Sequence, residues 1–242
     1  ENDNKSFQGS IILGMGFTFD DTNPEATPIA VMHQLVERAP RNAERIFPYL
    51  GGEELNTSPT HAHHRYAINF GQMTKEQAQD WPDLLAILEE RVRPERAKKS
   101  REIAAAPWWQ YWRSRPELSE ATGRLQRLLA VARVADALAF AFIPARSTPS
   151  DQLVVFIDDR FGFFSVLQSR VHDTWARFSA STMKDDLRYT PSDCFEPFPF
   201  PSGWATVGPL DSIGKTYYDV RAALMVQRGE GLTKTYSRFH DP

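Results

Sequence analysis

Several features that define common protein classes are scarce or missing in this chain of 242 residues. Its single cysteine, Cys194, excludes an internal disulfide and a cysteine-rich zinc site, and is compatible with a reducing cytoplasm. No apolar run reaches the roughly 18 residues of a membrane span, and no signal peptide is recognisable. We therefore expect a cytoplasmic protein with no membrane partner. The chain begins with Glu1 rather than Met, which suggests a fragment or a processed protein.

Motifs for nucleotide binding and nucleophilic catalysis are absent or incomplete. Gly14-Met-Gly16 is the one phosphate-loop-like pattern, but it lacks the further glycines and the following helix that would present backbone donors. No Gly-x-Ser-x-Gly elbow occurs, and Cys194 has no histidine nearby in the sequence. The pairs Asp158-Asp159 and Asp185-Asp186 could serve acid–base or metal chemistry, although such pairs are usually turn or capping residues. The residues contain no recognisable catalytic set.

Three histidines, His61, His63 and His64, lie within four residues. Imidazole is the usual nitrogen ligand of metals, so a metal site is one interpretation. Close neighbours in a loop rarely reach one ion without distant partners, and no acidic residue follows at a suitable spacing. We favour a surface loop that could touch phosphate.

Charge is distributed unevenly, although the chain as a whole carries −3. Residues 91–146 hold 12 Lys or Arg against 5 Asp or Glu, while the remainder holds 16 against 26. A basic middle between acidic segments can present one positive face, which suits nucleic acid. The alternative is a set of solvated helix faces without a ligand.

Aromatic residues follow the most basic part of this segment. Trp108, Trp109, Tyr111 and Trp112 come directly after a run rich in Lys and Arg. Basic side chains provide phosphate contacts, and indole rings can stack on bases or fill a core. We favour core packing for the tryptophans, because Pro107 and Pro116 flank them.

Hydrophobic periodicity predicts an α+β chain with a mixed, largely antiparallel sheet, flanking helices and a helical C-terminal tail. Helices are expected at residues 27–39, 75–101 with a break near Pro94, 116–123, 163–183 and 217–228. Strands are expected at residues 10–19 with a glycine interruption, 66–70, 127–132, 139–143 and 153–157.

The clearest expected helix, residues 163–183, carries two stripes. Apolar residues recur at three- and four-residue steps and predict one buried face; they are Phe164, Leu167, Val171, Trp175 and Phe178. Basic residues recur every seven positions on another face; they are Arg170, Arg177 and Lys184.

A succession of motifs carries a resemblance to a known family. The motifs are Leu13-Gly-Met-Gly-Phe17, Phe47-Pro-Tyr-Leu-Gly-Gly-Glu-Glu-Leu-Asn56, Arg115-Pro-Glu-Leu118, Leu167-Gln-Ser-Arg-Val-His-Asp-Thr-Trp175, Leu187-Arg-Tyr-Thr-Pro-Ser-Asp-Cys-Phe195 and Phe198-Pro-Phe-Pro201. Together they resemble the target-recognition domain of MmeI-like (type IIL) restriction–modification enzymes and related adenine-N6 DNA methyltransferases. The resemblance places a recognition domain at residues 1–205 and the start of a helical C-terminal region at residues 206–242.

The resemblance implies sequence-specific binding of double-stranded DNA. In that family an upstream domain of the same chain binds S-adenosylmethionine and carries an Asn-Pro-Pro-Tyr motif, and neither that motif nor a cofactor-binding glycine motif occurs in this sequence. The segment itself is therefore expected to bind no cofactor and to catalyse nothing, while the parent protein methylates DNA. Its expected partners are double-stranded DNA and the upstream methyltransferase domain.

The resemblance also suggests where bases are read, namely on loops after the Trp-Trp motif and just before the Phe-Pro-Phe-Pro segment. Those positions hold Arg133, Asp136, Arg146, Ser147, Ser150, Lys184, Asp186 and Arg188. Arg and Lys pair with guanine O6 and N7, and Asp accepts from cytosine N4. Phosphate contacts are expected from Lys98, Lys99 and Arg101.

Two alternatives stay open. Arg188 could be structural, tied to Asp186 or Asp193, and Arg133 has a similar ambiguity because it interrupts an apolar run. The whole domain could instead be a structural or protein-interaction module of a phage-defence complex.

Overall fold

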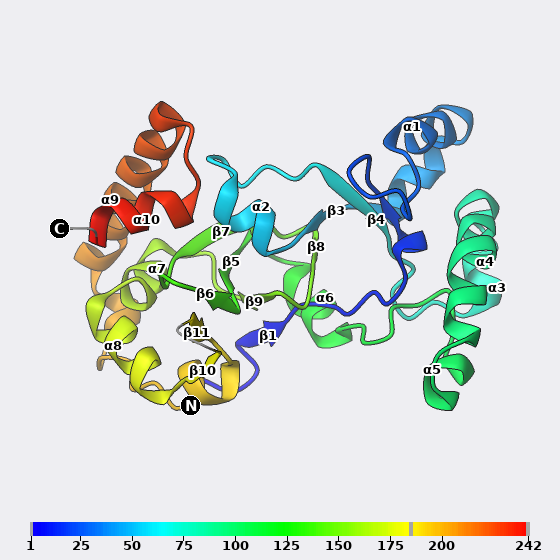
Figure 1. Ribbon diagram of the computed structural model, residues 1–242. Coiled ribbons are helices and arrows are strands. Elements are labelled where there is room, and N and C mark those ends of the chain that lie inside the picture. The colour runs from blue at the N-terminus through cyan, green and yellow to red at the C-terminus, as the bar shows by residue number, and fades with distance from the viewer. Residues whose placement is uncertain (1, 184–185, 241–242) are drawn as a thin grey trace.

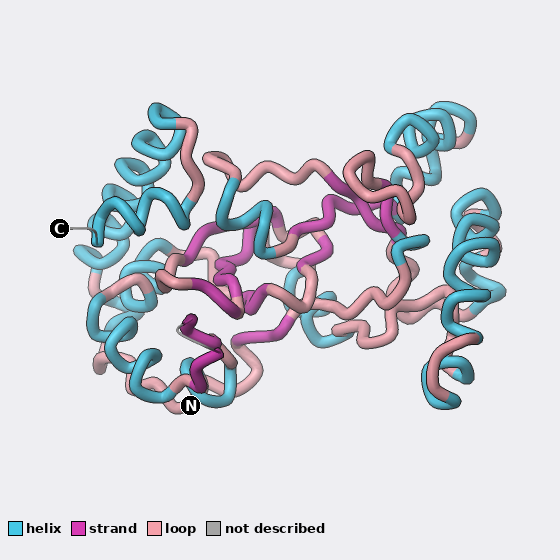
Figure 2. The backbone as a smooth tube through the Cα atoms, in the orientation of Figure 1, coloured by secondary structure: helices cyan, strands magenta, loops and turns pink. Residues whose placement is uncertain are grey.

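A computed structural model describes residues 2–183 and 186–240, and its α+β architecture confirms the predicted fold class. Strands occupy the middle of the molecule, and helices cover its two ends (Figures 1 and 2). The strands are β1 Ser6–Gln8, β2 Thr18–Phe19, β3 Ile46–Leu50, β4 Arg65–Ile68, β5 Arg127–Ala132, β6 Val134–Ala135, β7 Phe140–Pro144, β8 Thr148–Pro149, β9 Leu153–Phe156, β10 Ser181–Met183 and β11 Asp186–Arg188.

Ten α-helices lie within the described residues: α1 Ile29–Arg38, α2 Gly52–Thr57, α3 Lys75–Ala78, α4 Pro82–Ala97, α5 Arg101–Ala105, α6 Pro116–Thr122, α7 Phe161–Leu167, α8 Arg170–Ser179, α9 Gly208–Arg228 and α10 Leu232–His240. Short 3₁₀ or π turns add η1 Met15–Phe17, η2 Pro40–Arg45, η3 Pro191–Phe195 and η4 Trp204–Thr206. None of the described helices combines the length and apolar character that crossing a bilayer requires.

The central sheet has the antiparallel order β1-β9-β5-β7 and is buried on both faces. Alternate residues of β5 show this, since Leu128 and Ala130 join one core cluster, and Leu129 and Val131 join another. The first cluster includes residues of α2, α6, α9 and α10, and the second includes residues of α7, α8 and η3. Burial on both faces explains the nearly continuous apolar run of β5 in the sequence.

A second sheet, with the order β2-β4-β3-β8, supports the other end of the molecule. Its core cluster includes Phe17, Trp81 and several apolar residues of α4. Strand β8 pairs with β3 in parallel, with Tyr49 opposite Thr148 and Leu50 opposite Pro149. This short pairing connects residues about a hundred positions apart and joins the two sheets.

The single helix expected over residues 163–183 is wrong, because the chain forms α7, α8 and then β10 there. Ser169 begins a new helix, and its side chain accepts a hydrogen bond from the backbone N–H of His172. The interruption changes the helical phase, so Val171 is 71% exposed and Phe178 is 88% exposed. The predicted stripe is therefore buried only in its first part, at Phe164 and Leu167.

Two other element predictions need correction. Residues 75–101 break at residues 79–81 rather than at Pro94, because Pro82 occupies the first turn of α4, where its missing N–H costs nothing. Pro94 is accommodated near the C-terminal end of α4. Residues 10–19 form η1 and β2 rather than one strand, and Gly16 packs so closely on α4 that a Cβ there would lie 2.5 Å from the Cβ of Arg91.

Candidate nucleic-acid interface

A small third sheet brings the most distant candidate residues together at one edge of the fold. Strands β10 and β11 form a hairpin, and β11 pairs with β6 so that Arg188 lies opposite Val134. The backbone N–H of Tyr189 also donates to the carbonyl oxygen of Arg133, at 2.8 Å. Arg133, Asp136, Asp186 and Arg188, from two segments about fifty residues apart, therefore share this edge. Lys184 lies outside the described residues.

Arg133 is half-buried beside a second basic side chain. Its Nη1 donates to the backbone oxygen of Asp151 at 3.0 Å, and its backbone N–H donates to the backbone oxygen of Gln152 at 2.8 Å. Burial lowers the pKa of Arg133, and the positive charge of Arg188 lowers it further. The β6–β11 pairing thus concentrates positive charge at this edge, which favours an electronegative ligand.

Asp193, one of the two residues to which Arg188 could be tied, has other partners. Within the described residues no ion pair joins Arg188 to Asp193, whose carboxylate accepts from the hydroxyls of Thr190 at 2.8 Å and Ser192 at 3.0 Å. The side chain of Asp186 is not described. Arg188, a half-buried residue, is therefore not held by Asp193.

The hairpin rests on a rigid aromatic base. Tyr189 is fully buried, and its hydroxyl lies 2.9 Å from Nε2 of His172. Burial lowers the pKa of His172 to about 3, so its imidazole is neutral at physiological pH. The rings of Phe140 and Phe156 pack against Tyr189 with centroids 5.9 and 6.3 Å away. The C-terminal end of β11 is therefore fixed in the core, while the polar residues of the strand lie at the edge.

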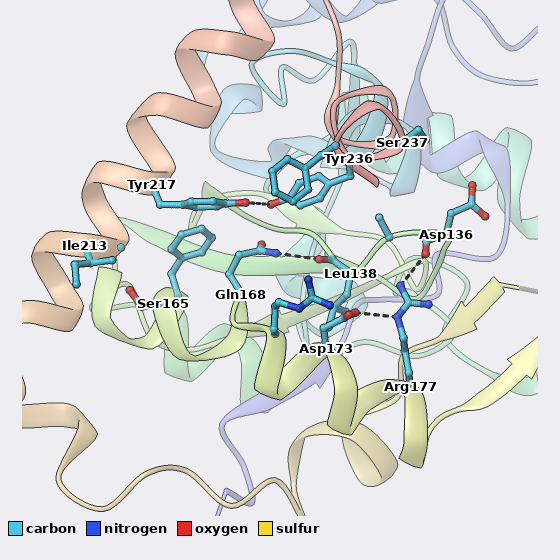
Figure 3. A pocket seen from close by; sticks show the side chains of 15 residues that line it. Asp136, Leu138, Ser165, Gln168, Asp173, Arg177, Ile213, Tyr217, Tyr236 and Ser237 are labelled. Carbon is cyan, nitrogen blue, oxygen red and sulfur yellow. Dashed lines mark hydrogen bonds and ion pairs between the residues drawn. The ribbon is translucent and has the colours of Figure 1, made fainter. Parts of the chain in front are cut away.

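Asp136 is exposed beside α8 and lines a cavity of about 630 Å³. Arg177 holds this segment by donating from Nη2 to the backbone oxygen of Asp136 at 3.1 Å and from Nε to Asp173 at 3.0 Å. Figure 3 shows Asp136 and Arg177 on one side of the cavity and Tyr217 of α9 on the other. Arg177 therefore positions the turn after β6.

The segment from residue 146 to residue 150, which contains β8, has one exposed candidate. Arg146 is exposed, with its guanidinium carbon 5.5 Å from the ring centroid of Phe47. The Ser147 hydroxyl donates to the carbonyl oxygen of Pro144 at 2.7 Å. Ser150 is only 3% exposed, and its backbone N–H donates to Leu50 at 2.8 Å. Of the three, Arg146 is the side chain open to a ligand, and the other two stabilise the loop.

Lys98, Lys99 and Arg101 are exposed at the end of α4 and the start of α5. Lys99 lies 3.7 Å from Glu95. Figure 1 places α5 at the opposite end of the molecule from the β10–β11 hairpin. These three residues and the hairpin therefore form separate basic surfaces.

Buried side chains account for much of the basic and aromatic run. Arg96 is 1% exposed and donates to the carbonyl oxygens of Ile12, Leu13 and Pro107, so it is a structural residue rather than part of a basic face. Trp108 and Trp109 pack against the core, as we expected. A surface ligand would meet fewer cations here than the sequence suggests.

The histidine cluster has structural contacts. Nδ1 of His61 lies 2.8 Å from the carbonyl oxygen of Leu55, and burial lowers the pKa of His61 to about 4. His64 lies 3.4 Å from Glu54. Among the described residues, no group of three or more His, Cys, Asp or Glu side chains could hold a metal ion.

Comparisons with known proteins place this geometry in a family. Residues 27–202 match the family described as "MmeI, target recognition domain". The fold is similar to that in the structure of the type IIL restriction–modification enzyme MmeI in complex with DNA, with a TM-score of 0.67 and 16% identity. That similarity covers 98% of this chain and 30% of the other chain, so this chain spans about a third of the length of its structural neighbour. No curated protein matches the sequence.

The class of protein is thus a target-recognition domain, the kind of module that selects a DNA sequence. More particularly, the chain belongs to the MmeI target recognition domain family, which confirms the resemblance seen in the sequence.

Proposed function

We propose that this chain reads double-stranded DNA through the edge formed by β6 and the β10–β11 hairpin. The observation that supports this most strongly is the pairing of β11 with β6, which brings the backbones of Arg133 and Arg188 to one edge that also carries the acidic candidates Asp136 and Asp186. A two-stranded ribbon fits the major groove of B-DNA. Arginine there forms paired hydrogen bonds with guanine, and aspartate accepts from cytosine.

Two hydrogen bonds that fix the backbone next to candidate residues favour a specific readout. A base-reading side chain must be held in one place, because discrimination between bases depends on hydrogen-bond geometry. The hydrogen bond between Tyr189 and His172 fixes the position next to Arg188. The hydrogen bond from Arg177 fixes the backbone of Asp136. The reading groups would therefore be presented on a preformed surface.

The methyl chemistry is proposed to lie outside this chain, in a domain that binds S-adenosylmethionine and methylates adenine at N6. In support of this, Gly16 of the Gly14-Met-Gly16 pattern packs against α4, where a Cβ would lie 2.5 Å from the Cβ of Arg91, so this pattern offers no open phosphate cradle. Phe198, the first residue of Phe198-Pro-Phe-Pro201, is buried, and its ring centroid lies 4.4 Å from that of His172. Phe198 thus packs beneath the hairpin. This chain would contribute the choice of site.

The test is a selection from random-sequence duplexes, done with the wild-type chain and with Arg188→Ala. We expect the wild type to enrich a defined sequence and the variant to lose preference at one position, with discrimination falling by about 1–3 kcal/mol. Arg93→Ala is the control, because Arg93 is an exposed arginine paired with Glu89 on α4. An unchanged consensus in Arg188→Ala would remove Arg188 from the readers.

A protein-interaction module is the alternative function. Its discriminating measurement is the salt dependence of duplex binding, since phosphate contacts make affinity fall steeply between low and moderate salt. Duplex binding that is insensitive to salt would favour the alternative.

A further inference from the structure

A second group of arginines lies around the β3–β8 pairing, apart from the hairpin edge. Arg45 ends η2 just before β3, and Arg146 comes two residues before β8. Because Tyr49 lies opposite Thr148 in this parallel pair, continuing the register by two residues brings Arg146 beside Phe47, where its guanidinium carbon lies 5.5 Å from the ring. Arg45 precedes Phe47 by two residues, so the fold brings two arginines that are about a hundred residues apart to the same end of β3.

The surroundings of Arg45 leave its charge largely uncompensated. Its guanidinium carbon lies 4.5 Å from the centroid of the Trp81 ring, as does that of Arg41. Its Nε is buried and has no hydrogen-bond partner within the described part of the chain. Burial lowers the pKa of Arg45, Glu44 opposes this, and the charges of Arg146 and Arg41 lower the pKa further.

Carboxylates near the cluster are engaged mainly by one of its members. Arg41 lies 3.1 Å from Asp80 and 3.8 Å from Glu44. Neither Arg45 nor Arg146 makes an ion pair with any residue that the structure describes. Arg146 is exposed and Arg45 is half-buried, so both are open to a ligand while Arg41 is held.

We propose that Arg45 and Arg146 form a phosphate-binding pair that anchors the DNA backbone at the β3–β8 junction, separately from the base-reading hairpin. Aromatic rings under both guanidiniums fix their positions without consuming their hydrogen-bond donors. Each guanidinium carries several N–H donors that suit phosphate oxygens. This inference rests on the proposed function, because it takes DNA as the ligand.

The experiment measures binding of a fluorescent random-sequence duplex to the whole chain across a series of KCl concentrations. Each phosphate contact contributes about 0.9 to the slope of log affinity against log salt. We expect R45Q/R146Q to lower the magnitude of that slope by between about 1 and 2, and to weaken two unrelated duplexes by the same factor. R146Q alone should lower it by about 0.9.

The matched control is R38Q/R93Q, which removes the same charge from two exposed arginines that pair with Asp83 and Glu89. An equal fall in slope in this control would show an effect of net charge and overturn the proposal. An unchanged slope in R45Q/R146Q would also overturn it. Should circular dichroism show R45Q/R146Q to be unfolded, R146Q alone decides, because Arg146 is exposed.

The two proposals fail in different ways. If R45Q/R146Q lowers the slope while Arg188→Ala leaves the selected consensus intact, phosphate anchoring stands and base reading by Arg188 falls. If the wild-type chain does not bind duplex DNA at any salt concentration, both fall.

Discussion

The ion pair between Glu54 and Arg65 provides a stringent test of how the two sheets are joined. The Glu54 side chain is fully buried, and its carboxylate accepts from Arg65 Nε at 2.6 Å, from Arg65 Nη2 at 2.8 Å and from the backbone N–H of Gly51 at 2.8 Å. It thereby ties α2, which packs on the central sheet, to β4 of the second sheet.

We predict that Glu54→Gln lowers the free energy of unfolding by about 3–5 kcal/mol, the usual cost of removing one partner from a buried pair. The side chain of Arg65 is only 16% exposed, so water compensates little for the lost carboxylate. Glu53→Gln is the control, since Glu53 is the exposed neighbour in the same helix. Its loss should cost at most about 1 kcal/mol through the helix dipole.

The assay is urea unfolding followed by circular dichroism, at pH 7 and at lower pH. Burial alone would raise the pKa of Glu54, but the hydrogen bonds from Arg65 and Gly51 outweigh it and lower the pKa overall. A carboxyl group with a lowered folded-state pKa stabilises the protein above its unfolded pKa of about 4.3. This stability is lost as the pH falls through the folded-state pKa.

The difference between wild type and Glu54→Gln should therefore shrink as the pH falls below about 4. A Glu54→Gln effect below about 1 kcal/mol at pH 7, or equal to that of Glu53→Gln, would refute this reasoning.

Three further predictions concern packing, titration and the distant basic surface. Gly214→Ala should lower the melting temperature, because its Cβ would lie 2.3 Å from the carbonyl oxygen of Phe161. The control Gly208→Ala, at a position with open space around it, should not. Equal melting temperatures of the two variants would contradict the α7–α9 packing. His172→Gln should flatten the pH dependence of stability. Below pH 6.5 the unfolded wild type binds a proton at His172 that the folded protein does not bind until about pH 3, so the free energy of unfolding falls by about 1.4 kcal/mol per pH unit. Equal losses of stability between pH 7 and pH 5 in variant and wild type would count against a neutral buried imidazole. Replacing the α4–α5 cations should leave the selected consensus unchanged, and a shifted consensus would show that they read bases; the variant is K98Q/K99Q/R101Q.

Local pattern predicted the elements that have a continuous apolar run or a regular amphipathic spacing. The strand predicted over residues 127–132 matches β5, and the helix predicted over residues 27–39 contains α1. The error at residues 163–183 has a local cause, since Ser169 provides an N-cap within an otherwise helical apolar spacing. A serine in such a run can lie inside a helix or begin one, and the spacing of apolar residues does not distinguish the two.

The candidate site was accessible from the sequence only in part. The resemblance pointed to Arg133 and Arg188, but their meeting depends on the pairing of β6 with β11, two short strands without a strong pattern. The sequence did not identify Arg45 as a candidate, because only the parallel pairing of β3 with β8, two residues on each strand, brings Arg146 to its end of β3. Arg96 is one of the twelve basic residues of the segment 91–146, and its burial could not be predicted because the carbonyl oxygens that it contacts at Ile12 and Leu13 are distant in the sequence.

The most direct test of DNA reading by the hairpin is a structure of this chain bound to the duplex that it selects. We predict that β10 and β11 lie in the major groove, with the guanidiniums of Arg133 and Arg188 within hydrogen-bond distance of base edges. A complex in which this edge faces away from the duplex, or meets only phosphates, would contradict the account.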